Sequence, residues 1–284
     1  FFNGKYFMAL SWIAMVVSAA IAATSGEVSL TGEDAQGIFF SIGSHLSGSP
    51  TLSLFINLAL ATAIGALLLI LNKVYSFVRS VTDLLASAFF LLTAANPLTS
   101  YTLNGGTALA LMVAVGAFYT FASYNNKHAQ RSIFLTFTVV TFCTMFQWEF
   151  VLLLPAFFIG FCYMRIMNWR SVTAMLLGIF VPFWIVLGLG IASPSDFNPF
   201  FLSSVWDELD LTQARLLIVS VAVTALAAIA LTVVNLYTII SYRLQLRVYN
   251  VFFMFVAILS IVAMCIDYGE LHMFLPMLNL CLAV

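Results

Sequence analysis

Charged residues are the scarcest class in this sequence. Asp, Glu, Lys and Arg make up 7% of its 284 residues and hydrophobic residues make up 63%, whereas about a quarter of an ordinary soluble domain is charged. So few charges would not cover the surface of a soluble protein of this length. The formal net charge of −1 also lacks the basic excess that nucleic acid requires. The composition therefore excludes a nucleic-acid partner and predicts an integral membrane protein.

Several chemical motifs are missing as well. The sequence contains no Walker A loop, Rossmann glycine fingerprint, GxSxG or HExxH, which argues against ATP-driven transport and soluble-type hydrolysis. Its cysteines lie in apolar stretches without CxxC or Cys/His ligand spacing, and we interpret them as small hydrophobic residues inside helices. They are Cys143, Cys162, Cys265 and Cys281.

Long apolar runs are what the sequence does contain. A bilayer core takes about 20 apolar residues of helix, and each segment must satisfy its own backbone groups. We therefore predict an all-α fold, a single polytopic transmembrane bundle over residues 1–284 with about ten helices. The segments lie near 6–23, 51–72, 81–97, 106–124, 132–146, 149–165, 171–191, 213–238, 249–266 and 271–284.

The start of the sequence has two interpretations. Residues 6–23 follow Lys5 and end in an alanine-rich stretch, as a signal peptide does. We interpret them as a retained first helix. Because the sequence begins with Phe1 and not with methionine, we expect the natural start to lie upstream.

The longest apolar run, Ser132–Met164, requires a break. As one helix it would span about 50 Å, too long for a core of about 30 Å. Arg131 and Arg165 flank it, and basic residues at both ends predict that both ends lie on the cytoplasmic side. We therefore predict two short helices that turn at Gln147–Glu149 near the outer face, with Trp148 at the interface.

Basic and acidic residues fall on opposite sides of the membrane when the N-terminus is placed in the cytoplasm. All basic residues except Arg215 then face the cytoplasm, and all acidic residues except Asp83 face out. Because basic residues set orientation, we expect a multi-pass protein of a bacterial inner membrane with both ends cytoplasmic. The acidic residues predicted outside are Glu27, Glu33, Asp34, Glu149, Asp196, Asp207, Glu208, Asp210, Asp267 and Glu270.

Two longer outer loops, 24–50 and 192–212, are the first places to look for function. In the first, Thr31–Asp34 has capping-box spacing and precedes an apolar helical face, which predicts a short interfacial helix. Glu33 and Asp34 are candidate catalytic carboxylates or metal ligands, but acids at this position also simply stabilise a helix N-terminus. His45 either assists these acids in the site or is an ordinary solvated histidine of the loop.

Three further residues are candidates. Arg215, the one basic residue predicted outside, suits a substrate phosphate, or else pairs with Asp207 or Asp210. Glu149 lies at a helix turn, where a charge near membrane depth is a functional candidate. His272 stands near Asp267 and Glu270, and the three residues either bind a divalent cation or occupy an exposed loop.

The order of these features resembles the GT-C superfamily of membrane glycosyltransferases. The resemblance is carried by the first helix, the acidic outer loop and a series of turns at Asn96–Pro97, Asn104–Thr107, Asn125–Arg131, Gln147–Glu149, Pro155 and Asn168–Arg170. It implies that an acid of the first outer loop, Glu33 or Asp34, is catalytic and that the donor is a polyprenyl-phosphate sugar. Residues 168–170, 176–178 and 181–182 also resemble an uncharacterised polytopic family of Bacteroidetes-type bacteria, which implies no activity.

Three functions therefore remain open. The first is a GT-C-like enzyme, or a relative of one, that acts on a lipid-linked sugar at the outer face. The second is a non-catalytic subunit or scaffold of a cell-envelope complex, with other membrane proteins as partners. The third is a lipid or small-molecule transporter, which would favour charges at the bilayer midplane, whereas here the charges gather at the interfaces. All three predict contact with membrane lipids.

Overall fold

The protein is all-helical in a computed structural model that describes residues 4–25, 50–76, 83–96, 100, 103–124, 126, 129–191, 215–238, 244–266 and 271–284. Within these ranges there is no strand. The helices are α1 (Gly4–Ser25), α2 (Pro50–Tyr75), α3 (Leu84–Ala94), α4 (Gly105–Ala122), α5 (Gln130–Thr144), the 3-10 helix η3 (Trp148–Leu152), α6 (Leu153–Tyr163), α7 (Trp169–Gly188), α8 (Arg215–Thr238), α9 (Leu244–Ile266) and α10 (Leu271–Ala283).

Five helices of the described chain, α1, α2, α4, α7 and α9, are long and apolar enough to cross a membrane. The all-helical fold is therefore confirmed, and five helices that could cross a membrane are consistent with a multi-pass protein. The shorter helices do not each reach across a bilayer. With 11 residues in α3 and 13 in α10, these helices rise only about 17 and 20 Å, against a core of about 30 Å. Ten complete spans stay a prediction.

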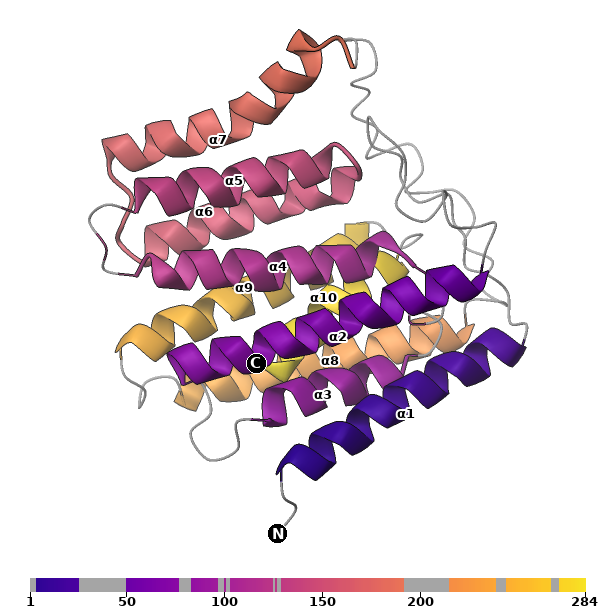
Figure 1. Cartoon of the computed structure of the whole chain (residues 1–284). Coiled ribbons are helices and arrows are strands. Elements are labelled where there is room, and N and C mark those ends of the chain that lie inside the picture. Colours follow the sequence, from indigo (N-terminus) through magenta and orange to yellow (C-terminus); the bar gives the residue numbers. More distant parts are fainter. Residues whose placement is uncertain are drawn as a thin grey trace.

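Successive helices run in opposite directions between two ends of the bundle. Helices α5, α7 and α9 begin at the left of Figure 1, where α2 and α4 end. We call this the basic end, because the basic residues of the described ranges belong to it by position, Arg215 excepted; they are Lys5, Lys73, Arg131, Arg165, Arg170 and Arg247. The other is the loop end, where α1 and α7 end and α2 and α8 begin. The predicted separation is confirmed for the basic residues that the structure describes; Arg79, Lys127 and Arg243 lie outside them, and the side that faces the cytoplasm stays a prediction.

The break in the longest apolar run is confirmed. Helix α5 ends at Thr144, and Gln147 has an extended backbone (φ −146°, ψ 129°) that cannot continue a helix. The chain then returns through η3 and α6, which lies beside α5 in Figure 1 and packs against it. The turn begins two residues earlier than its predicted position at Gln147, because Met145 and Phe146 already follow tightened backbone hydrogen bonds.

Two asparagines set the starts of long helices. The Asn104 Oδ1 atom accepts a hydrogen bond from the Thr107 backbone N–H at 3.1 Å, and Asn168 Oδ1 accepts one from Ser171 at 2.9 Å. Such N-caps satisfy one of the otherwise unpaired N–H groups of a first helical turn. They place the starts of α4 and α7 within two residues of the predicted positions, 106 and 171.

Phenylalanine fills the core opposite glycine. A Cβ on Gly65, Gly116 or Gly160 would lie within 2.7 Å of the ring of Phe90, Phe157 or Phe252, respectively. Small residues let membrane helices approach closely where the hydrophobic effect does not drive them together. Phe90, Phe157 and Phe252 are therefore packing groups between helices.

Candidate functional site

The candidate residues from the sequence fall into two groups. Glu33, Asp34 and His45 lie outside the described residues. Of the others, Arg215 begins α8, His272 lies in the first turn of α10, and Glu149 lies in η3; for these three the structure describes the backbone.

Arg215 and His272 nevertheless stand at the starts of two helices that are neighbours in the fold. Helices α8 and α10 pack against each other, and both begin at the loop end. The short connections of α8 to α9 and of α9 to α10 make α8 and α10 parallel. The meeting of Arg215 with Glu33 or Asp34 stays a prediction.

Toward the loop end, the described helices bury a group of neutral polar side chains, which we call the amide–hydroxyl cluster. Each member is at least nine-tenths buried. The members are Ser53 and Asn57 of α2, Thr93 of α3, Ser100, Asn104 and Thr107 near the start of α4, Gln147 before η3, and Asn279 of α10. None carries a charge, so the cluster can lie inside a membrane bundle without the cost of burying an ion.

Hydrogen bonds tie α2 to the connection between α3 and α4. Asn57 Nδ2 donates to the Ser100 carbonyl at 2.8 Å, and the Leu103 N–H donates to Ser53 Oγ at 2.7 Å. Ser100 Oγ donates in turn to the Thr93 carbonyl at 3.2 Å. The first two bonds satisfy the Ser100 carbonyl and the Leu103 N–H, which lie outside the helices and need partners in a membrane interior.

A small cavity lies within the cluster. Its volume is about 10 Å³, and its polar lining comes from Asn57, Thr93, Ser100, Thr107 and Asn279. Asn279 is 1% exposed, and neither amide atom has a hydrogen-bond partner among the described protein groups. A cavity of this size admits one water-sized guest. It is too small for a sugar ring, so the cluster can supply only the floor of a sugar site.

Gln147, in the turn before η3, packs against the start of α4. Its side chain is fully buried and lies against Gly105, where a Cβ would approach Gln147 Oε1 to 1.7 Å. Glycine at 105 therefore leaves the space that the amide occupies. Through Gln147, the cluster reaches the element that carries Glu149.

The hydrogen bond of Asn57 gives a first prediction. We expect Asn57→Leu to lower the free energy of unfolding by on the order of 1–3 kcal/mol, because it leaves the Ser100 carbonyl buried without its donor. Thermal denaturation of the purified chain in detergent measures the effect. The control is Thr24→Val, since the exposed Thr24 hydroxyl bonds only the Ile21 carbonyl of its own helix at 2.9 Å. Equal midpoints for the two variants would contradict a structural role of the cluster.

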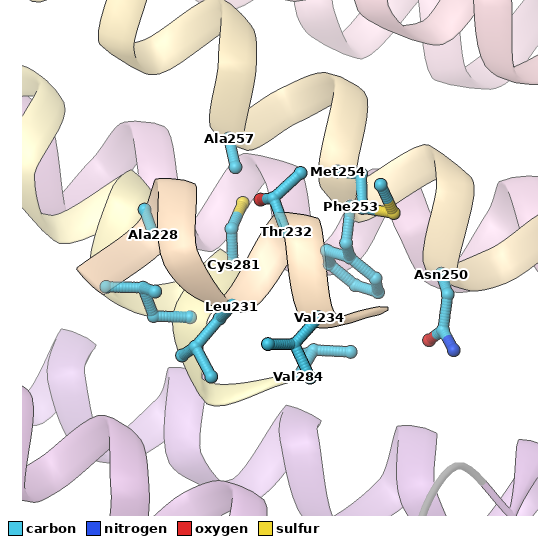
Figure 2. Close-up of a pocket in the computed structure, with 11 residues that line it drawn as sticks. Ala228, Leu231, Thr232, Val234, Asn250, Phe253, Met254, Ala257, Cys281 and Val284 are labelled. Carbon is cyan, nitrogen blue, oxygen red and sulfur yellow. The ribbon is translucent and has the colours of Figure 1, made fainter. Parts of the chain in front are cut away.

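A second cavity lies between α8, α9 and α10 and has a volume of about 210 Å³. Figure 2 shows Cys281 among Ala228, Thr232 and Ala257, with Asn250 at the edge of the group. Most of its lining is apolar, so the cavity suits an apolar chain better than a polar substrate.

The divalent-cation hypothesis rests on residues 267–272 and on Glu33 and Asp34, which lie outside the described residues. Within the described ranges no three His, Cys, Asp or Glu side chains come together as metal ligands. Asp267 and Glu270 lie outside those ranges, so a cation held by these residues stays a prediction.

Neither protein-family models, curated proteins nor solved structures match this chain. The GT-C resemblance and the resemblance to a Bacteroidetes-type family therefore stay predictions from sequence pattern.

Proposed function

We propose that this chain is a GT-C-like glycosyltransferase, or a relative of one, that takes a polyprenyl-phosphate sugar at the loop end. The observation that carries the proposal is the amide–hydroxyl cluster, which places neutral hydrogen-bonding side chains directly beneath that end. Amides and hydroxyls are groups that bind sugar hydroxyls without a charge. The cluster would form the floor of the site and the two outer loops would complete it.

The charged groups take separate roles in this proposal. Glu33 or Asp34 acts as the base or metal ligand that activates the acceptor. Arg215 neutralises charge on the departing lipid phosphate. Its place at the start of α8 supports this role, because it is the basic residue of the described chain that lies away from the basic end.

The proposal requires the loop end to face outward from a bacterial inner membrane. We expect cysteines introduced at Gly32, Glu149 or Asp207 to react with a membrane-impermeant maleimide added to intact cells. Cysteines at Asn126 or Gln245, which lie at the basic end, should react only after the membrane is opened.

The native cysteines are replaced first, and each variant is labelled with and without permeabilisation as its own control. Reaction at Asn126 in intact cells would reverse the orientation and remove the outer-face site. Activity itself is measured as transfer of radiolabelled sugar from polyprenyl phosphate in membranes that contain the chain, against membranes that lack it.

A further inference from the structure

A pocket of about 600 Å³ opens at the basic end, far along the helices from the amide–hydroxyl cluster. It lies where α4 and α6 end and α9 begins. Its polar lining comes from Arg165, Arg247, Tyr124 and Tyr163, together with the thiol of Cys162, and the remaining lining is apolar. The pocket therefore combines two guanidinium groups, two tyrosine hydroxyls and an apolar wall at one end of the bundle.

The backbone at Arg165 is unusual. Its φ is +56°, in the left-handed region that glycine or asparagine usually occupies after a helix and that costs another residue roughly 1 kcal/mol or more. A cation is favourable at the C-terminus of α6, so the helix accounts for part of this choice.

The helix dipole does not account for Arg247. This residue lies in the first turn of α9, where the dipole disfavours a cation. Two arginines from different helices line this one pocket, where both can offer N–H donors to one anion. Arginine also matches phosphate through paired N–H donors.

We propose that this pocket binds the phosphate of an anionic lipid headgroup. The guanidinium groups of Arg165 and Arg247 hold the phosphate oxygens, and Tyr124 and Tyr163 lie at the headgroup level, where tyrosine is enriched. The apolar wall receives the first carbons of the acyl chains. Basic pockets between membrane helices on the side rich in Lys and Arg are typical sites for such lipids. The inference is independent of any activity at the loop end.

Cys162 supplies a direct readout, because its exposed thiol lines the pocket. The full chain is placed in nanodiscs of phosphatidylcholine, with or without phosphatidylglycerol, and treated with N-ethylmaleimide. Mass spectrometry follows alkylation at each cysteine. We expect phosphatidylglycerol to slow the alkylation of Cys162 and to leave that of Cys265, an exposed cysteine near the other end of α9, unchanged.

Charge variants test which groups hold the lipid. Arg165→Asn keeps a residue that tolerates the left-handed backbone, and Arg247→Gln removes the other cation. Each should raise the phosphatidylglycerol content needed for half-protection by about tenfold, because each removes charge-assisted hydrogen bonds. The matched control is Arg170→Gln, an exposed arginine at the same end outside the pocket. The double variant Arg165→Lys, Arg247→Lys should retain most of the protection, since it keeps both charges.

Three results would overturn the assignment. Equal slowing of Cys162 and Cys265 would show a general effect of the charged bilayer. An Arg170→Gln variant that loses as much protection as the pocket variants would point to diffuse surface charge. Protection by glycerol 3-phosphate in phosphatidylcholine nanodiscs, equal to that by phosphatidylglycerol, would make a soluble phosphate ester the ligand in place of a lipid.

Discussion

Replacing the proposed catalytic carboxylate by its amide, Glu33→Gln or Asp34→Asn, should lower sugar transfer by a factor of about 10² or more. The amide keeps the size of the side chain and its capacity to accept a hydrogen bond, but it cannot take up a proton or bind a cation strongly. We expect one of the two variants to show the full loss. Expression should change little, because the carboxylate is proposed to face the substrate and not the helix packing. The measurement is the rate of transfer from a polyprenyl-phosphate sugar in membranes with equal amounts of protein.

Glu27→Gln is the matched control, since Glu27 is an acid of the same outer segment to which no role is assigned. Arg215→Gln should also lower transfer, because it removes the charge proposed to neutralise the departing phosphate. Full transfer by both carboxylate variants would contradict the enzymatic proposal. A chain without any transfer activity, with or without these changes, would leave the scaffold hypothesis as the better one.

The helical fold could be predicted because its signals are local or depend on length. Composition predicted the membrane class, and the length of the Ser132–Met164 run against the thickness of a bilayer predicted its break. Helix ends were less accurate. The predicted segment 81–97 contains an α3 of only 11 residues, because apolar composition continues past the last helical hydrogen bond. Hydropathy measures the affinity of a segment for lipid and not the geometry of its ends.

The amide–hydroxyl cluster was not predicted, because its members carry no charge and form no motif in the sequence. Asn57 and Asn279 lie in apolar stretches, and the sequence does not show that both line one cavity with Thr107. The two asparagines are themselves a weak sequence signal for such a cluster, since an asparagine within a membrane helix needs a polar partner. The basic-end pocket was missed for a different reason. Arg165 and Arg247 were both assigned to the basic side correctly, but only the packing of α6 against α9 brings them to one pocket.

Close approach of α5 and α7 depends on one glycine. A Cβ on Gly178 would lie 2.8 Å from the Phe134 carbonyl oxygen and 3.0 Å from the Phe137 Cβ. These neighbours are backbone or the first side-chain atom, so they cannot rotate away as the tip of a long side chain does. The same carbonyl accepts a hydrogen bond from the Thr138 hydroxyl at 2.8 Å. Any larger residue at 178 must therefore move one helix against the other.

We expect Gly178→Leu to lower the free energy of unfolding by about 3 kcal/mol, at the upper end of what overpacking costs, since the helices must separate along their contact. Gly188→Leu is the control, because it lies in the same helix and a Cβ there meets nothing within 4 Å. Leucine is also a better helix former than glycine, so this variant should be as stable as the unchanged chain or slightly more stable. Thermal denaturation in detergent, followed by gel filtration of the remaining folded protein, compares the two. Matching midpoints would show that α5 and α7 do not pack through Gly178.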